Sequence, residues 1–236
     1  MLLIMKMKME RAVIFDLFGT LVSTFPSSHH DRVLWRMAEI LQAESTAFAK
    51  VFDDEMRRDR EVGRYATLEE SIEQACKRLG IRVERQRVYR AAQLKYDFTR
   101  RALRARSDAV KVLKYLKTKG YRIGLISDCP PEVPAVWEET VFAPWIEVAV
   151  FSCKAGVKKP DALIYKMAYE SLEVLAEHCV YVGDGDSMEL QGAKEIGMEA
   201  FLIRVEEEEG WDRDRPRLER WRGKRIARLS DLIGQL

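Results

Sequence analysis

Five short apolar segments, each ending at a polar or charged residue, most strongly constrain the fold of this 236-residue chain. Each is continuously apolar rather than alternating, which is typical of strands buried on both faces of a parallel sheet. The segments are AVIFD (12–16), RIGLISD (122–128), EVAVFS (147–152), CVYVGD (179–184) and EAFLIR (199–204). Stretches with helical periodicity, at 107–120, 159–172 and 187–198, follow or separate the later segments. This alternation predicts an α/β fold with a doubly wound parallel sheet.

The region between the first two apolar segments has a different pattern. Residues 24–105 contain no continuous strand-like run, and four amphipathic helices are expected at 31–44, 45–61, 67–80 and 84–105. We therefore predict a Rossmann-like core formed by residues 1–22 and 106–236, with an inserted α-helical cap at 23–105. Such an insertion would lie over the carboxyl end of the first strand, where open α/β sheets bind ligands.

Charge and composition exclude several classes of partner. The 40 basic and 38 acidic side chains nearly cancel, so nucleic acid and anionic membranes are not expected as partners. No segment approaches the roughly 20 apolar residues of a membrane span. The four cysteines form no CxxC pair, which indicates free thiols and a cytoplasmic protein. A charged fraction of 33% and the absence of asparagine are typical of a heat-adapted source.

One segment near the C-terminus carries the densest charge of the chain. Residues 206–225 (EEEEGWDRDRPRLERWRGKR) are expected to form a solvated surface excursion, with Trp211 and Trp221 as its anchors.

Polar side chains stand at the ends of the predicted strands. Asp16 ends the first strand, Ser127 lies at the end of the second, Lys158 and Lys159 follow the third, and Asp184 ends the fourth. The carboxyl ends of parallel strands meet at one edge, so these groups should converge beneath the cap. Two aspartates suit Mg²⁺, and a hydroxyl with a lysine suits phosphate oxygens. The pattern therefore predicts phosphoryl transfer, with Asp16 free to attack phosphorus.

The turn after the first strand could also bind phosphate. Gly19 and Thr20 lie in a tight turn, and we expect their backbone N–H groups to form an anion-binding nest.

Four segments in order resemble the motifs of the haloacid dehalogenase (HAD) superfamily: DLFGTL (16–21), ISD (126–128), GVKKPDALIY (156–165) and VGDGDSMELQGAKEIGM (182–198). The resemblance implies that Asp16 is a nucleophile that forms an aspartyl intermediate. It implies that Ser127 and Asp128 belong to the phosphate-binding motif, and that Lys159, directly before Pro160, neutralises the nucleophile and the phosphate.

The same resemblance implies a Mg²⁺ site. Its ligands would be Asp16, Asp184 and the backbone carbonyl of Phe18. Glu189 stands where the superfamily often has aspartate, so it is either a further metal or water-shell carboxylate or part of a helix capping box with Asp186.

Phe18 departs from the pattern of the phosphatases in the superfamily. These usually have a second aspartate there, which protonates the leaving group and contributes roughly 10²–10⁴-fold in rate. An aromatic residue is instead similar to the 2-haloacid dehalogenases, whose halide leaves without a proton. Asp184 favours a phosphatase, because dehalogenases need no metal and usually have serine at that place.

Groups in the predicted cap could complete either kind of site. The candidates for a halide and carboxylate cradle are Arg32, Arg36 and Lys50, and the candidates for a replacement of the missing acid are His29, His30 and Asp31. Cys129 is expected to pack rather than to react.

The expected function is Mg²⁺-dependent hydrolysis of a small phosphate monoester. The alternatives are a 2-haloacid dehalogenase and a non-catalytic protein that binds phosphate or a partner. The sequence gives no indication of the oligomeric state.

Overall fold

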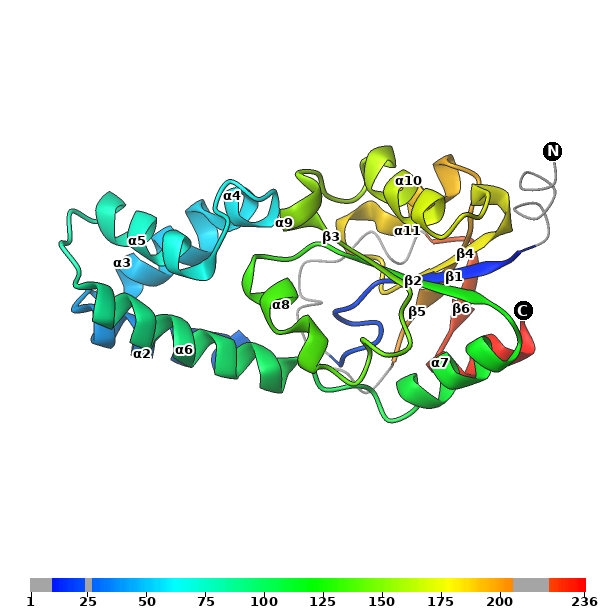
Figure 1. Ribbon diagram of the computed structural model, residues 1–236, viewed down its shortest axis with the longest axis horizontal. Helices are drawn as coiled ribbons and strands as arrows, with labels where there is room; N and C mark the ends of the chain where they lie inside the picture. The colour runs from blue at the N-terminus through cyan, green and yellow to red at the C-terminus, as the bar shows by residue number, and fades with distance from the viewer. Residues whose placement is uncertain (1–9, 24–26, 206–220) are drawn as a thin grey trace.

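The computed structural model describes residues 10–23, 27–205 and 221–236 and shows a six-stranded parallel sheet covered by helices (Figure 1). The strand order β3-β2-β1-β4-β5-β6 confirms the predicted doubly wound α/β fold. The strands are β1 (Ala12–Phe15), β2 (Arg122–Ser127), β3 (Val148–Phe151), β4 (Cys179–Gly183), β5 (Glu199–Ile203) and β6 (Lys224–Ile226).

Both faces of the sheet are buried, which explains the continuous apolar runs. In β1, Val13 and Phe15 belong to the core formed with α7 (Ala109–Thr118) and η7 (Leu229–Gly234). Ala12 and Ile14 point to the other face, whose core includes α10 (Ala162–Ser171) and residues of α11 (Glu189–Glu195). Figure 1 shows α10 and α11 on one side of the sheet and α7 on the other.

The segment between β1 and β2 forms a helical unit with its own apolar core. Figure 1 shows this unit beyond the carboxyl ends of the strands, with α2 and α6 side by side. The expected helix at 45–61 is divided in three by a π-helical turn. The elements are α2 (Ser27–Leu41), α3 (Ser45–Ala49), η1 (Lys50–Glu55), α4 (Arg57–Glu61), α5 (Leu68–Arg78) and α6 (Arg85–Ala102). None of the helices in the described ranges is long and apolar enough to cross a membrane.

Short elements connect the core strands. They are α8 (Glu132–Ala135), η2 (Trp137–Glu139), α9 (Ser152–Ala155), η3 (Ala176–His178) and η4 (Asp186–Met188). The predicted helix at 159–172 begins later than expected, at Ala162, because the Asp161 side chain caps it by accepting a hydrogen bond from Leu163 N at 2.9 Å.

The C-terminal charged segment contains a strand that the sequence analysis did not predict. β6 extends the sheet parallel to β5, with Ile226 opposite Ile203. Its three residues include Lys224 and Arg225, so local composition gave no strand signal. Trp221 packs against the core as predicted, whereas Trp211 lies outside the described residues.

Candidate active site

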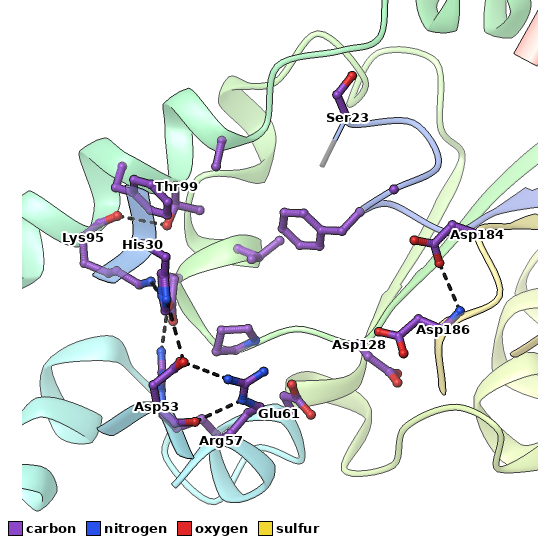
Figure 2. A pocket seen from close by; sticks show the side chains of 18 residues that line it. Ser23, His30, Asp53, Arg57, Glu61, Lys95, Thr99, Asp128, Asp184 and Asp186 are labelled. Atoms are coloured by element: carbon purple, nitrogen blue, oxygen red, sulfur yellow. Dashed lines mark hydrogen bonds and ion pairs between the residues drawn. The ribbon is translucent and has the colours of Figure 1, made fainter. Parts of the chain in front are cut away.

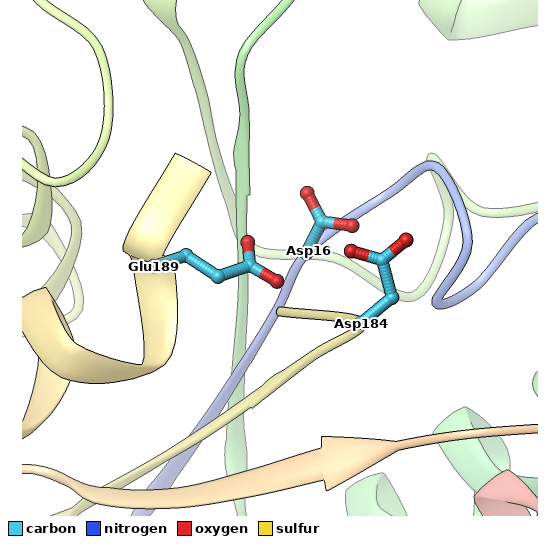
Figure 3. A group of neighbouring side chains, drawn as sticks. All are labelled: Asp16, Asp184 and Glu189. Carbon is cyan, nitrogen blue, oxygen red and sulfur yellow. The ribbon is translucent and has the colours of Figure 1, made fainter. Parts of the chain in front are cut away.

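The structure brings three carboxylates together at the carboxyl edge of the sheet (Figure 3). Asp16 directly follows β1, Asp184 directly follows β4, and Glu189 opens α11. One carboxylate oxygen from each residue lies within 4.8 Å of the others, and all three side chains are buried. The predicted convergence of Asp16 and Asp184 is therefore present in the fold.

Lys159 is the cation of this cluster. Its Nζ lies 2.6 Å from Asp16 Oδ1 and 2.5 Å from Glu189 Oε2. Its backbone N–H donates to Asp128 Oδ1 at 3.0 Å, so the carboxylate after β2 fixes the loop that carries the lysine. Lys158 points elsewhere and pairs with Glu61 of α4. Of the two neighbouring lysines, the structure places Lys159 in the site.

Burial dominates the electrostatics of the cluster. It raises the pKa of Asp16 to about 6, an effect that Lys159 opposes and Asp184 reinforces. Burial likewise raises the pKa of Glu189 to about 8. For Lys159, burial alone would lower the pKa, but the charges of Asp16 and Glu189 outweigh it and hold that pKa well above its ordinary value. The cluster therefore has more negative charge than one lysine compensates.

Glu189 does not form the capping box that the sequence allowed. Its Oε1 accepts from Gly185 N at 2.9 Å, and its Oε2 accepts from Tyr181 Oη at 2.8 Å as well as from Lys159. A Cβ on Gly183 would lie 2.1 Å from Glu189 Oε1, so a side chain at that position would displace the Glu189 carboxylate. The side chain turns into the site and holds Lys159, whereas Asp186 accepts a local bond from its neighbour's N–H.

The turn after β1 is shaped differently from the expected anion nest. Gly19 N donates to Val22 O at 2.8 Å and Thr20 N donates to Leu17 O at 3.3 Å, so both N–H groups are used inside the turn. The nest interpretation was therefore wrong for these two groups. Gly19 has φ +79°, and a Cβ there would lie 1.9 Å from Asp184 Oδ2. Its role is to let Asp184 approach the backbone.

Arg106 holds the same turn and was missed by the sequence analysis. Its Nε donates to Thr20 O and its Nη2 to Gly19 O, both at 2.7 Å. Arg106 lies in an arginine-rich stretch outside the four motifs, so no local signal distinguished it.

Four buried oxygens at the carboxyl edge of the sheet have no hydrogen-bond partner among the described residues: Asp16 Oδ2, Thr20 Oγ1, Ser127 Oγ and Asp128 Oδ2. Buried polar atoms are nearly always paired, so such a group indicates a place where a ligand or ion binds. The cluster thus fits a hard cation, which prefers oxygen ligands.

A cavity of about 380 Å³ opens above the cluster, between the helical unit and the core (Figure 2). It is lined by Phe18, Gly19, Ser23, His30, Asp53, Arg57, Arg60, Glu61, Lys95, Phe98, Thr99, Ala102, Asp128, Pro130, Glu132, Val133, Asp184 and Asp186.

The lining of the cavity shows which of the candidate proton donors, His29, His30 and Asp31, lies near the site. His30 lines the cavity, whereas His29 and Asp31 are exposed. Burial, followed by the nearby Lys95 ammonium, lowers the pKa of His30 to about 4, so its ring is neutral and an unsuitable acid near neutral pH. Cys129 is buried in the core, as expected.

The cap cations suggested for a carboxylate cradle lie elsewhere. Arg32, Arg36 and Lys50 do not line this cavity, and the cations that do are Arg57, Arg60 and Lys95. Arg57 and Arg60 lie in the short helix α4 and Lys95 lies in α6, all outside a recognisable motif, so only the packing of the cap identifies them.

A doubly wound parallel sheet that gathers carboxylates and a lysine beneath an inserted helical unit is the architecture of haloacid dehalogenase-like enzymes. The sequence matches the haloacid dehalogenase-like hydrolase family over residues 10–197. The chain belongs to this family.

Curated relatives of this chain include phosphatases. A glyceraldehyde 3-phosphate phosphatase of Methanopyrus kandleri is 26% identical over 83% of this chain and 84% of its own length. Three other curated relatives share only a shorter stretch, in which this chain spans 36% to 43% of their length.

Solved structures show the same fold. An HAD phosphatase from Thermococcus onnurineus superposes with a TM-score of 0.67 at 21% identity, over 95% of this chain and 97% of that one. A 2-haloacid dehalogenase from Pseudomonas syringae superposes with a TM-score of 0.69 at 21% identity, over 96% and 97%. The fold itself therefore does not choose between the two activities.

Proposed function

We propose that this protein is a Mg²⁺-dependent phosphatase that hydrolyses a small phosphate monoester through an aspartyl-phosphate intermediate. The observation that carries the proposal is Asp184, whose buried carboxylate lies beside Asp16 and close to the backbone of Gly19, where a Cβ would collide with it. Relatives named glyceraldehyde 3-phosphate phosphatase support the same class of reaction.

The donor set fits Mg²⁺. Two unit charges about 4 Å apart repel by roughly 4 kcal/mol at an effective dielectric near 20, so Asp16, Asp184 and a phosphate dianion need a further cation. Asp16, Asp184 and the backbone carbonyl of Phe18 would hold the ion. Both Glu189 oxygens already accept hydrogen bonds, which favours a role in positioning Lys159 rather than direct ligation. When bound, Mg²⁺ neutralises the carboxylates and polarises the phosphate.

The chain's own groups would carry the remaining chemistry. An oxygen of the Asp16 carboxylate attacks phosphorus, and the bond from phosphorus to the leaving oxygen breaks. Lys159, held by Glu189 and Asp128, orients Asp16 and offsets its charge, and Ser127 Oγ is available to hydrogen-bond a phosphoryl oxygen. Water then hydrolyses the aspartyl phosphate, which releases inorganic phosphate and regenerates Asp16.

Phe18 favours a second candidate, 2-haloacid dehalogenation. Phe18 lines the cavity where a phosphatase of this superfamily would usually present an acid. In a dehalogenase Asp16 would displace halide from carbon, and the halide would leave without a proton or a metal.

The metal requirement separates the two candidates. Phosphate release from a panel of monoesters should stop in EDTA and return with Mg²⁺, and Asp184→Ala should weaken metal binding and activity together. The proposal is wrong if EDTA-treated protein instead releases halide from 2-chloropropionate at enzymatic rates. A protein that binds phosphate and Mg²⁺ but turns over neither class of compound would be the non-catalytic alternative.

A further inference from the structure

The cavity above the carboxylate cluster has two chemically different ends. Figure 2 shows Asp128, Asp184 and Asp186 at one end, and His30, Asp53, Arg57 and Lys95 at the other. The first end would receive the phosphate and its metal. The second end, formed mainly by α2, η1, α4 and α6, would receive the organic part of the substrate.

Four ionisable side chains at the second end are almost fully buried. Arg60 and Glu132 are each 2% exposed, Lys95 is 5% exposed and His30 is 9% exposed. Taking charged groups out of water is costly unless each is paired. A buried charge without a full partner therefore indicates which charge a ligand in this cavity would supply.

One cation at this end has no carboxylate within hydrogen-bonding distance among the described residues. Arg57 Nη2 lies 2.8 Å from Asp53 Oδ2, and Arg60 Nη2 lies 2.7 Å from Glu132 Oε1. Lys95 Nζ lies 3.8 Å from the same oxygen of Glu132, which Arg60 already occupies. Glu61, the third carboxylate at this end, is paired with Lys158 outside the cavity. Lys95 is therefore the cation in excess.

The Lys95 ammonium also has unused donors. It carries three N–H groups and no acceptor. One N–H is directed at His30 Nε2, 2.6 Å away, and the ring of Phe98 lies 5.1 Å from Nζ. The other two N–H groups have no acceptor among the described residues, although the side chain lines the cavity.

We propose that Lys95 binds a carboxylate on the organic part of the substrate, so that the enzyme acts on short phosphorylated hydroxy acids. One carboxylate supplies one negative charge and acceptors for both unused N–H groups. A neutral hydroxyl would leave the positive charge uncompensated, and a second phosphate dianion would exceed it. Asp128, Asp184 and Asp186 would repel the carboxylate from the other end and so set the orientation of the substrate. This inference rests on the phosphatase function proposed above.

Two pairs of phosphate esters test the proposal, because the members of each pair differ only in a carboxylate against a hydroxymethyl group. The pairs are 3-phosphoglycerate with glycerol 3-phosphate, and 4-phosphoerythronate with erythritol 4-phosphate. In at least one pair the acid should have the higher kcat/KM, by about 10- to 150-fold, as for one hydrogen bond between charged groups. Acetyl phosphate, which has no tail to reach Lys95, reports on the phosphate end alone.

Lys95→Met should abolish the preference for the acid, measured as the ratio of kcat/KM for acid and alcohol and normalised to the hydrolysis of acetyl phosphate by the same variant, and Lys95→Arg should keep part of the preference. Arg100→Met is the matched control, because Arg100 lies on the same helix but pairs with Glu139 outside the cavity. Equal rates for acid and alcohol in the wild type would overturn the proposal without any variant. A preference that survives in Lys95→Met would overturn it too.

A binding experiment separates this inference from the proposed function. Asp16→Asn protein in Mg²⁺ is titrated calorimetrically with inorganic phosphate and with each ester. If phosphate binds but the acids bind no more tightly than the alcohols, only the role of Lys95 is wrong. If neither phosphate nor any ester binds and acetyl phosphate is not hydrolysed by the wild type, the phosphatase function fails and this inference fails with it.

Discussion

Lys159→Met should destabilise the protein far more than the same substitution one residue earlier. Lys159 is 4% exposed, and its Nζ contacts Asp16 Oδ1 at 2.6 Å and Glu189 Oε2 at 2.5 Å. Removing one partner of a buried ion pair leaves an uncompensated charge and costs about 3–5 kcal/mol. The side chain of Lys158 is 31% exposed and pairs with Glu61, so Lys158→Met should cost less than about 1 kcal/mol.

The size of this effect should depend on pH in a defined direction. Without Lys159, the pKa values of Asp16 and Glu189 rise further above those of the unfolded chain. When the pKa of a carboxyl group is raised in the folded state, the free energy of unfolding falls as the pH rises from the unfolded-state pKa to the folded-state pKa. The penalty of Lys159→Met should therefore be larger at pH 8 than at pH 5.5, where both groups can bind a proton.

Urea unfolding in EDTA, followed by circular dichroism, measures the free energies of unfolding directly. Glu189→Gln and the double variant complete a thermodynamic cycle, in which the two changes should couple by at least about 1 kcal/mol. The explanation is refuted if Lys159→Met stays within about 1 kcal/mol of wild type at pH 8, or if Lys158→Met is the more damaging variant.

Three further predictions concern single side chains. Asp16→Asn should abolish turnover while the far-ultraviolet spectrum and the melting transition persist, and a rate within tenfold of wild type would show that Asp16 is not the nucleophile. With Phe18 in place of an acid, aryl and acyl phosphates should be hydrolysed much faster than alkyl phosphates, because the leaving oxygen departs without a positioned proton donor. Phe18→Asp should flatten this dependence in a plot of log kcat/KM against leaving-group pKa, whereas an already shallow wild-type slope would mean that another group donates the proton. Because burial lowers the pKa of His30 to about 4, its unfolded form binds more protons, so wild-type stability should fall by on the order of 2 kcal/mol between pH 7 and pH 5 through this group. His30→Gln should remove that part of the pH dependence and His29→Gln, on the exposed side of the helix, should not.

The hydrophobic periodicity of the segments and the order of the predicted strands and helices were enough to predict the fold class. The strands around Asp16, Ser127 and Asp184 are apolar on both faces, and only a sheet covered on both sides buries such runs. The polar residues at their ends then had to meet at one edge, because parallel strands share the direction of their carboxyl ends. Local information therefore sufficed for the sheet core, for its inserted helical unit and for most of the carboxylate cluster.

Other features depended on contacts between residues far apart in the chain. β6 has three residues in a charged stretch, and only its pairing with β5 makes it a strand. Glu189 matched a capping box locally, but Lys159 and Tyr181 draw its side chain into the site. The sequence suggested that the N–H groups of Gly19 and Thr20 bind an anion, but both donate hydrogen bonds to carbonyl oxygens within the turn.

The substrate end of the cavity depended most completely on tertiary structure. His30, Lys95 and Glu132 come from three separate helices, and none of the three belongs to a recognisable motif. A carboxylate or ammonium on an amphipathic helix looks the same in sequence whether it faces solvent or a cavity. Five of the six strands and the edge where Asp16 and Asp184 meet followed from local periodicity and strand direction. The burial and pairing of the charges in the cavity depend on the packing of the helical unit on the core, which local sequence does not encode.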